Sequence, residues 1–351
     1  MTTKYISHGT YGCVMKPAVP CKKDDKDNKN KVSKIFYKKE NALDEYKFNA
    51  KIAKQIDPKG EFTVKELDYC DIALSKFPEV DQCQWDSSYL KQKIIKQIVY
   101  EYGGISLRDA CVTIHPHALF STFKPLFVGL VTLSKKGWIH CDIKPENMLF
   151  NVETRKTVFI DWGMLTNNKD VYINNSKMFF SYPYYYYPPE FIMYFNEHNK
   201  KMGFNSIPPI DVLRNFKLFF GNQFVKDSLK NVSDKLYNTV YKVMVDDFVS
   251  YMSKPDLHIF DPSKIDVFAL GISLIQMIVN ESGIHRYSKK LKEDLLVLAC
   301  KMCYLNPVKR MKPEDALEKF EKLYKRRLCA PRKIQNIVSG RCGLKSRQVY
   351  K

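Results

Sequence analysis

Hydrophobic and polar residues alternate along most of the first hundred residues, which is the pattern of half-buried β-strands. The alternating segments are 4–19, 32–37, 62–75 and 93–104. A charged stretch at 20–31 that begins with proline separates the first two and suits the exposed turn of a hairpin. Residues 39–56 instead carry hydrophobic residues at helical spacing. The pattern predicts a mostly antiparallel lobe with one helix over residues 1–103.

The spacing of hydrophobic residues becomes helical after Gly103 and Gly104. The expected helices are 107–113, 123–138, 234–252, 263–279 and 289–305, and the expected short strands are 147–153 and 157–163. These elements predict a second, larger and mainly helical lobe over residues 104–325. The predicted fold class is therefore α+β with two lobes.

Composition places the chain among folded proteins, because 45% of its 351 residues are hydrophobic and 13% are aromatic. The first residues lack the apolar segment of a secretion signal. No apolar run reaches the roughly 18 residues of a membrane span, and the nearest, 265–280, is interrupted by polar residues. A soluble protein without a membrane span is expected.

The ten cysteines show no spacing typical of a disulfide framework. In a long chain without a secretion signal, they are expected to be reduced thiols of a cytoplasmic protein. The close pair Cys300 and Cys303 has no second pair or His cluster nearby. We therefore interpret these two as buried helix positions rather than zinc ligands.

The net charge of +19 is unevenly distributed. Residues 325–351 hold nine Lys or Arg and no acid, and we assign 326–351 to a basic tail. Such a tail suits nucleic acid or an acidic partner, and it equally suits a solvated end without a partner. No nucleic-acid-binding motif accompanies it, so the composition leaves both interpretations open.

A dense polar segment, "IHCDIKPEN", lies between apolar runs and contains Asp142, Lys144 and Asn147. Asp161 follows the apolar strand "TVFI" and precedes Trp162-Gly163. Two oxygen donors, Asn147 and Asp161, suit Mg²⁺ that shares its shell with phosphates. A structural network of acids is the alternative from these residues alone.

The N-terminal segment contains residues that suit phosphate binding. Gly9 and Gly12 in "SHGTYGCV" would let the backbone approach a phosphate chain, although a plain hairpin explains them equally. Lys34 on the next strand would direct a positive charge at the same phosphates, unless it is simply an exposed strand lysine. Glu45 on the following helix suits a partner for Lys34, and Glu40 competes with it.

The motif "IHCDIKPENMLF", followed by "DWG" 19 residues after its Asp, resembles the H-R-D-x-K-P-x-N … D-F-G pattern of eukaryotic-type protein kinases. The order of glycine turn, strand lysine, helix glutamate, catalytic loop and metal-binding turn also resembles that family, over about residues 5–325. The resemblance implies a bilobal kinase-like fold and a serine/threonine kinase that transfers the γ-phosphate of MgATP, or MnATP, to protein substrates.

The family's roles carry over to matching positions. Asp142 would be the catalytic carboxylate and Lys144 would steady the transferred phosphate, while Asn147 and Asp161 would hold Mg²⁺. The residues that the resemblance assigns to ATP binding are Ser7, Gly9, Gly12, Val14, Val32, Lys34, Glu45, Glu101 and Tyr102. Of these, Glu101 and Tyr102 would supply backbone hydrogen bonds to adenine, beside a gatekeeper, Tyr100.

Further positions match scaffold residues of the family. Pro189 and Glu190 resemble the motif that closes the activation segment, and Glu190 is expected to pair with Arg310. Asp266 is expected to brace the catalytic loop. Between Glu190 and Asp266 the chain is much longer than the family pattern requires, so we expect an insertion at about 195–262.

Other positions depart from the pattern. Cys141 stands where the family carries an arginine that binds a phosphorylated activation loop, which predicts activity independent of that phosphorylation. Ser7 and Trp162 replace a usual glycine and phenylalanine. The hinge, the "FIDWG" strand and the insertion resemble protein kinases of large nucleocytoplasmic DNA viruses, implying a place in the host cytoplasm or the virion. A pseudokinase scaffold and a small-molecule phosphotransferase are the alternatives.

Overall fold

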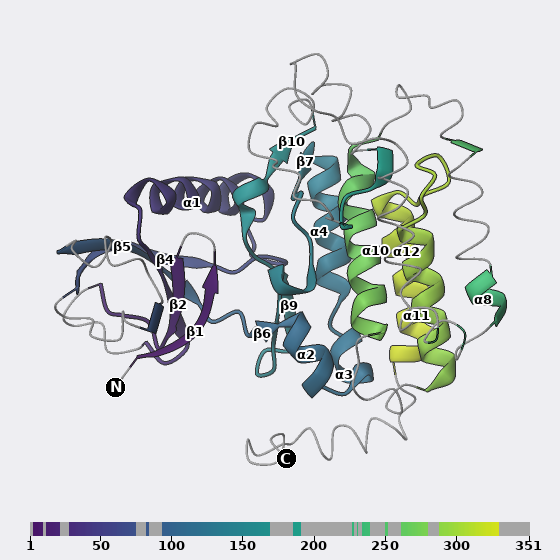
Figure 1. The fold of residues 1–351 in the computed structure, drawn as a ribbon, viewed down its shortest axis with the longest axis horizontal. Coiled ribbons are helices and arrows are strands. Elements are labelled where there is room, and N and C mark those ends of the chain that lie inside the picture. Colours follow the sequence, from purple (N-terminus) through teal and green to yellow (C-terminus); the bar gives the residue numbers. More distant parts are fainter. Residues whose placement is uncertain are drawn as a thin grey trace.

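A computed structural model describes the chain over separate ranges: residues 3–9, 12–21, 28–74, 82–83, 93–168, 185–190, 227, 230, 234–238, 250–251, 261–279 and 288–329. The fold is α+β, with a small antiparallel sheet region on the left of Figure 1 and a larger helical region on its right. The basic tail beyond residue 329 and most of the expected insertion at 195–262 lie outside the described residues.

The sheet has five strands in the order β1-β2-β3-β5-β4, and every neighbouring pair is antiparallel. Its strands are β1 (Lys4–Gly9), β2 (Gly12–Lys16), β3 (Lys31–Phe36), β4 (Glu66–Ala73) and β5 (Ile94–Glu101). Helix α1 (Lys39–Lys51), which continues as the π-turn η1 (Ile52–Ile56), packs beside this sheet (Figure 1). The predicted antiparallel region with one helix is confirmed.

The run 4–19, expected as one arm of a hairpin, contains the separate strands β1 and β2. Gly12 explains how closely β2 approaches β3, because a Cβ built on it would lie 2.0 Å from the carbonyl oxygen of Ile35. Glycine at this position therefore serves strand packing.

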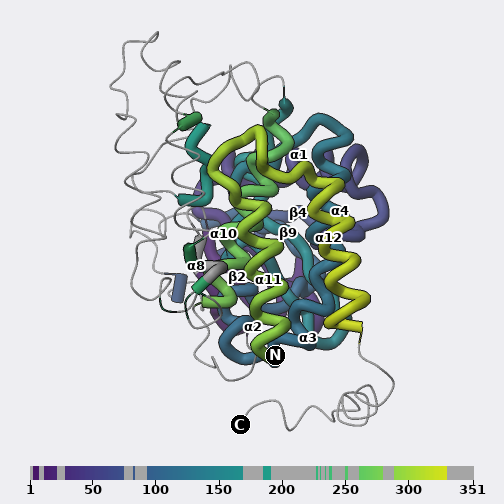
Figure 2. The backbone as a smooth tube through the Cα atoms, turned by 90° about the vertical axis from the view of Figure 1, so that its right-hand side faces the viewer, coloured from purple at the N-terminus to yellow at the C-terminus, as the bar shows by residue number. Residues whose placement is uncertain are grey.

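The helical region carries most of the buried core. Its main helices are α2 (Leu107–Thr113), α3 (Pro116–Phe120), α4 (Lys124–Lys135), α10 (Ser263–Val279), α11 (Lys289–Met302) and α12 (Pro313–Leu323), with the π-turn η11 (Tyr324–Leu328) and the short α8 (Asp234–Asn238). Figure 2 shows α4, α10, α11 and α12 running side by side. Nearly every residue of α10 is buried, as expected of a helix that is apolar all round.

Short strands and turns on the sheet-facing side of this region carry the polar loops. They are β6 (Ile105–Ser106), β7 (Trp138–Ile139), β8 (Met148–Asn151), β9 (Lys156–Phe159) and β10 (Thr166–Asn167), with 3₁₀ turns η5 (Pro145–Asn147) and η6 (Trp162–Met164). β8 pairs with β9 and with β6, all antiparallel. The predicted pair of short strands at 147–153 and 157–163 is thereby confirmed.

The two regions are joined by backbone contacts as well as by the chain. The segment before β4 meets β9, where the N–H of Phe159 donates to the carbonyl of Phe62 at 2.8 Å. The carboxylate of Asp57 holds this segment by accepting from the N–H of Phe62 at 2.8 Å and from the hydroxyl of Thr63 at 2.9 Å. The sheet is therefore fixed against the strand that leads to Asp161.

The helices predicted from periodicity agree with the structure at α2, α4, α10 and α11 within a few residues. The expected helix 234–252 is described only over Asp234–Asn238 and at residues 250–251. Helix α12 was not among the expected helices, although Ala316, Phe320 and Leu323 have helical spacing and Pro313 lies in its first turn, where proline is a helix-start signal.

Four cysteines of the sheet region form two disulfides, Cys13–Cys83 and Cys21–Cys70. The fold brings their Cα atoms to 5.6 and 5.8 Å, a span that a disulfide bridges. Sequence separations of 70 and 49 residues concealed both pairs. The expectation of reduced thiols is wrong for these four residues, and a cytoplasmic location stays a prediction. The free thiols of the described chain are Cys111, Cys141, Cys300, Cys303 and Cys329.

Cys300 and Cys303 are buried at the end of α11, which confirms their interpretation as helix and core positions. Within the described ranges no three His, Cys, Asp or Glu side chains gather into a group that could hold a metal ion.

One described segment, Pro116–Lys135, is long and apolar enough to cross a membrane, and 56% of its most apolar window is buried inside the protein. Core helices of folded proteins have the same composition. The described residues therefore show no clear membrane span.

Candidate active site

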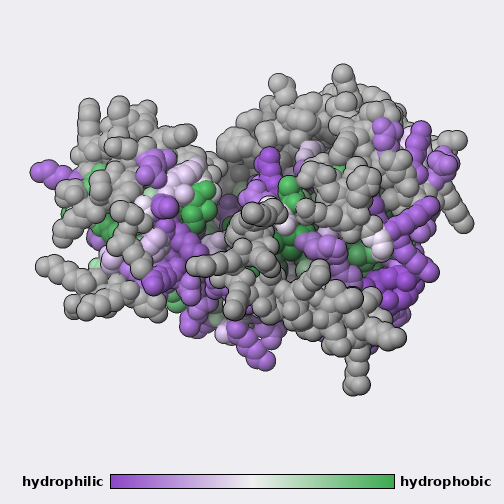
Figure 3. Space-filling view, turned by 90° about the horizontal axis from the view of Figure 1, so that it is seen from below, coloured by the Kyte–Doolittle hydropathy of each residue, from purple (hydrophilic) through white to green (hydrophobic). Residues whose placement is uncertain are grey.

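A cavity of about 620 Å³ lies between the sheet and the helical region. In Figure 3, patches of hydrophobic residues (green) lie beside hydrophilic ones (purple) in the middle of the molecule. The residues that line the cavity include Ser7, Val14, Val32, Lys34, Glu45, Asn49, Tyr100, Glu101, Tyr102, Gly103, Leu149, Asn147, Asp161 and Trp162. Both regions of the fold therefore contribute to one site.

The sheet supplies a fixed cation to this cavity. Lys34 Nζ lies 2.5 Å from Glu45 Oε2, which joins the middle strand β3 to helix α1. Both side chains are largely enclosed, with 17% and 16% of their surfaces exposed. The predicted pairing of Lys34 with Glu45 is confirmed, and Glu40 is not the partner. Val14 lies opposite Lys34 in the sheet and lines the cavity together with Val32.

The predicted glycine turn is only partly described. Ser7 pairs with Val14 and lines the cavity, and Gly9 pairs with Gly12 across β1 and β2. Residues 10 and 11 between them lie outside the described residues. A contact of this turn with phosphate stays a prediction.

The segment that links the two regions corrects one prediction. The N–H of Tyr102 donates to the carbonyl of Asn30 at 2.9 Å, and its carbonyl accepts from Asn151 Nδ2 at 2.8 Å. Both backbone groups of Tyr102 are therefore engaged inside the protein. The N–H of Tyr102 is therefore not the donor to adenine, and a contact of its carbonyl with adenine stays a prediction.

Gly103 is the residue that sequence reasoning missed. Its backbone N–H has no hydrogen-bond partner among the described residues, and the residue lines the cavity. A Cβ built on Gly103 would lie 2.7 Å from Leu149 and 2.8 Å from Val64, so glycine keeps this edge of the cavity open. The signal was available in the sequence, because backbone groups alternate in direction along an extended chain. Groups of Glu101 and Gly103 face the same side, and those of Tyr102 face away.

Buried Asp266 of α10 holds the backbone of the polar loop after β7. Its carboxylate accepts the backbone N–H of His140 at 2.7 Å and that of Cys141 at 3.0 Å. Burial raises the pKa of Asp266, while His140 and the two backbone donors oppose that rise. The ring of His140 lies 4.4 Å from Trp162 and its Nε2 lies 3.1 Å from the carbonyl of Ile160. The predicted bracing role of Asp266 is confirmed as a contact.

Asp142, Lys144 and Asn147 come together as one hydrogen-bonded group. Lys144 Nζ donates to both carboxylate oxygens of Asp142, at 2.9 and 2.8 Å. Asn147 Nδ2 donates to Asp142 Oδ2 at 2.6 Å and to its backbone carbonyl at 2.9 Å. The amide nitrogen of Asn147 is thereby used, and its oxygen is the atom left for a ligand.

Asp161 follows β9 with φ 62°, in the left-handed region that few residues other than glycine adopt. The residue is exposed and lines the same cavity as Asn147 and Lys34. Two oxygen donors do not make a complete metal site by themselves. They fit Mg²⁺, which takes few protein ligands and fills its shell with water and phosphate oxygens.

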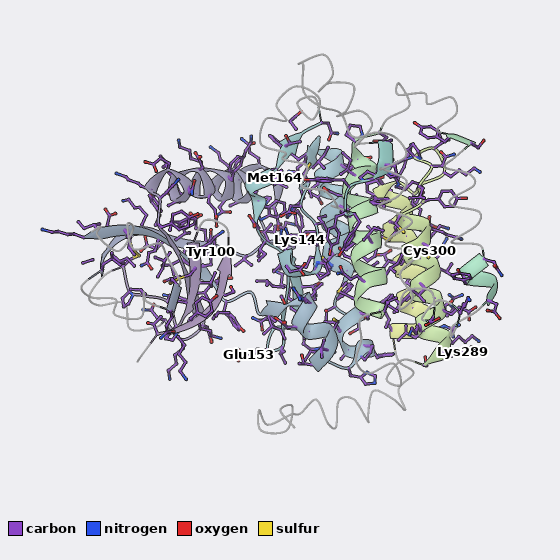
Figure 4. All side chains as sticks on the ribbon, in the orientation of Figure 1. Tyr100, Lys144, Glu153, Met164, Lys289 and Cys300 are labelled. Carbon is purple, nitrogen blue, oxygen red and sulfur yellow. A yellow bond between two sulfur atoms is a disulfide. The ribbon has the colours of Figure 1, made fainter. Side chains whose placement is uncertain are left out.

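A second cavity, of about 550 Å³, adjoins the first, because Arg108 and Glu146 line both. Lys144 and Glu146 line it together with two aromatic residues, Tyr185 and Tyr186. Figure 4 shows Lys144 near the middle of the molecule and Tyr100 on the sheet side. Asn147 lines the first cavity and Lys144 the second, and Asp142 is bonded to both. The carboxylate of Asp142 therefore links a lining residue of the first cavity to one of the second.

Glu190 and Arg310 form a buried ion pair, as predicted. Arg310 Nη2 donates to Glu190 Oε2 at 2.9 Å, and Nη1 donates to the other carboxylate oxygen. The side chain of Arg310 is 0% exposed and that of Glu190 is 2% exposed. Arg310 also donates to the carbonyls of Tyr304 at 2.8 Å and Leu305 at 3.2 Å. The pair ties the segment after Tyr187 to the loop before α12.

Cys141 is buried, with 2% of its surface exposed, and its φ of 64° is left-handed. Burial, followed by the nearby charges of Asp266 and Asp142, raises the pKa of its thiol well above the ordinary value. The side chain is thus neutral and shielded from solvent. It cannot offer a charged contact to a phosphate group.

Glu66 on β4 lies near Glu45 and Asn49, behind the cavity. Burial raises the pKa of Glu66 to about 7, a hydrogen bond from Asn49 lowers it, and the charge of Glu45 raises it. Its Oε2 is buried without a partner among the described residues. Between about pH 4.5 and 7 the folded protein binds more protons here than the unfolded chain. Stability is therefore lost as the pH rises through this window.

We expect Glu66→Gln to raise the free energy of unfolding by about 1–3 kcal/mol at pH 8, because the neutral amide avoids a buried charge. At pH 4 the variant and the native protein should be equally stable, since Glu66 is then protonated in both states. Urea unfolding at both pH values measures this. The exposed Glu61→Gln is the control and should change neither value. A gain of equal size at both pH values would contradict the assignment.

A scan of the chain against protein-family models finds no match, and no curated protein matches it either. What the site does is therefore inferred from its residues and their geometry.

Proposed function

We propose that this chain is a serine/threonine protein kinase with a protein-kinase-like fold, which transfers the γ-phosphate of MgATP to protein hydroxyl groups. The observation that carries this proposal is the position of Asp142. Its carboxylate is hydrogen-bonded to Asn147, which lines a large cavity together with Lys34 and Asp161, and to Lys144, which lines a second cavity. A donor and an acceptor bound in the two cavities would meet at this residue.

The first cavity has the chemistry that a nucleoside triphosphate requires. Lys34, oriented by Glu45, supplies positive charge for phosphates. The backbone N–H of Gly103 supplies a donor for the base, and Val14 and Val32 supply apolar walls. Pockets of this size with a few placed polar groups are typical of small-ligand sites.

Asn147 and Asp161 are the residues that would hold Mg²⁺. When bound, the ion neutralises charge on the phosphates. Asp142 would orient the acceptor hydroxyl and accept its proton, and Lys144, held by Asp142, would face the charge that develops on the transferred group. Positioning and charge account for most of the rate in phosphoryl transfer.

The second cavity, and the anchored segment that forms part of its wall, favour a protein acceptor over a small molecule. The cavity is open, and Tyr185 and Tyr186 on its wall belong to the segment that Glu190 and Arg310 anchor. Among the resembling families, that anchoring pair and a lysine two residues after the aspartate are typical of kinases that act on proteins. The resemblance to kinases of large DNA viruses, and a place in host cytoplasm or virion, belong to the same proposal.

The test is to incubate the purified chain with labelled MgATP and with acidic and basic model proteins. We expect label on serine or threonine of at least one protein, and substitution of Asp161 by Ala should remove it. ATP binding without any transfer would overturn the proposal and favour a pseudokinase scaffold. Transfer to small alcohols or amines alone would indicate a small-molecule phosphotransferase.

Activity is also expected to be independent of phosphorylation of the chain itself. Cys141 is buried and uncharged where the kinase pattern carries an arginine. This position therefore has no positive charge that could bind the phosphate of a phosphorylated activation loop. Phosphatase treatment, checked for completeness by mass spectrometry, should leave turnover unchanged relative to a mock-treated sample. Loss of turnover on dephosphorylation would contradict this prediction.

A further inference from the structure

The back wall of the nucleotide cavity contains a chain of polar side chains centred on Tyr100. Its hydroxyl donates to Glu45 Oε1 at 2.8 Å and accepts from Asn49 Nδ2 at 2.6 Å. We propose that the Tyr100 hydroxyl is a positioning group, which holds Glu45 and helix α1 in the orientation that pairs with Lys34. This inference rests on the proposed kinase function, because it concerns a residue that acts on the phosphate-binding lysine through Glu45.

Tyr100 is placed for this role by its strand. It lies on β5, paired with Val32 of β3 on one side and Glu66 of β4 on the other. Its ring packs with a small apolar cluster formed by Phe36, Ala42 and Ile98 and also lines the cavity. Burial, and then the charge of Glu45, raise the pKa of the phenol well above its ordinary value. The hydroxyl thus keeps its proton and can donate at neutral pH.

Glu45 depends on Tyr100 because its two carboxylate oxygens have different partners. Oε2 accepts from Lys34 Nζ at 2.5 Å, and Oε1 accepts from the Tyr100 hydroxyl. In a site where only 16% of the Glu45 side chain is exposed, water cannot fully replace a lost donor. Removing the hydroxyl leaves the carboxylate held only by Lys34 at Oε2, so the orientation of the carboxylate and of helix α1 relative to Lys34 is less strictly fixed.

Helix α1 itself contributes few buried side chains, although Phe48 packs against the main core and the helix continues into η1, whose Ile52 and Ile56 are buried. Ala42 is its one buried residue, and no side chain caps its N-terminus. Glu45 and Asn49 are four residues apart, so they lie on one face of α1 in successive turns. The Tyr100 hydroxyl bonds to both. A helix with so thin an apolar contact is held by these polar bonds as well as by packing.

The position of this helix is what activation-loop phosphorylation adjusts in many protein kinases. In this chain, the position whose arginine would bind a phosphorylated activation loop is occupied by the buried thiol of Cys141. Tyr100 and Asn49 instead hold α1 from within the sheet region, independently of any loop. This internal anchor fits an enzyme that is active without phosphorylation.

The experiment compares Tyr100→Phe with the native protein by kcat/KM for MgATP, alone and combined with Glu45→Gln. Loss of the hydrogen bond to a charged partner should lower kcat/KM about 10- to 100-fold in the native background. In the Glu45→Gln background the same change should have almost no effect, because the hydroxyl acts through the Glu45 carboxylate. An equal loss in both backgrounds would overturn the proposal and leave Tyr100 a merely structural residue.

Tyr69→Phe is the matched control. Tyr69 packs against the same apolar cluster, and its hydroxyl makes no hydrogen bond among the described residues. It should leave kcat/KM unchanged, and a loss equal to that of Tyr100→Phe would also overturn the proposal.

If the native chain transfers no phosphate, the kinase proposal fails, and two further measurements decide the positioning role. These are amide hydrogen exchange in residues 39–51 and affinity for MgADP. Faster exchange and weaker binding in Tyr100→Phe, but not in Tyr69→Phe, would support the role. No change in either would overturn it.

Discussion

Replacing Asp142 by Asn is expected to lower kcat for phosphate transfer by about 10²- to 10⁴-fold, the range for loss of a general base. The amide cannot accept the acceptor's proton. It also lacks the charge that holds Lys144 at 2.9 and 2.8 Å and that receives Asn147 at 2.6 Å. Single-turnover transfer from labelled MgATP to a model protein measures the loss.

Nucleotide affinity separates this chemical role from a general disturbance of the site. Asp142 is hydrogen-bonded to Asn147, which lines the first cavity, but does not line that cavity itself. MgADP should therefore bind the Asp142→Asn variant with nearly native affinity. Glu153→Gln, an exposed carboxylate in the turn after β8 (Figure 4), is the matched control and should keep full activity. Near-native kcat in Asp142→Asn would contradict the proposed role.

Replacing Arg310 by Met is expected to lower the free energy of unfolding by about 3–5 kcal/mol, the cost of breaking a buried ion pair on one side. The change leaves the buried carboxylate of Glu190 without its ion-pair partner and removes the hydrogen-bond donor of two backbone carbonyls. Urea unfolding followed by circular dichroism measures the difference.

Two further variants sharpen this stability prediction. The double variant Glu190→Met/Arg310→Met should be less destabilised than Arg310→Met, because no unpaired charge remains. Arg108→Met removes the exposed pair with Glu146, whose side chains are 71% and 38% exposed, and should cost no more than about 1 kcal/mol. A loss in Arg310→Met no greater than that in Arg108→Met would show that the buried pair does not stabilise this fold.

Much of the fold was predictable because its signals are local. The helical spacing at 263–279 matches α10 residue for residue, and alternation located β4 and β5 within a few residues. α12 was missed although its signals are local too, because Ala316, Phe320 and Leu323 recur at helical spacing after Pro313. The two disulfides were missed because periodicity carries no information about residues that are 49 and 70 positions apart.

The candidate site divides in the same way. Lys34, Asn147 and Asp161 were expected from motif spacing, and the structure brings them to one cavity. Motif spacing did not reveal that the N–H of Tyr102 is used inside the protein, because it ignores the direction of backbone groups along the linking segment. The hydrogen bond between Tyr100 and Glu45 joins residues 55 positions apart, on β5 and α1, and no sequence motif predicts it.

The sequence by itself determined the α+β class, most helices and strands, and the identity of the polar side chains of the site. These follow from spacing within short windows, where backbone geometry sets which residues share a face. The tertiary structure alone decided which carboxylate oxygen meets which donor, which backbone N–H stays free, and that Asp142 is bonded to a lining residue of each of two cavities. Those outcomes depend on how β5, α1 and α10 pack, because contacts between distant segments are selected by the whole core and not by any one stretch of residues.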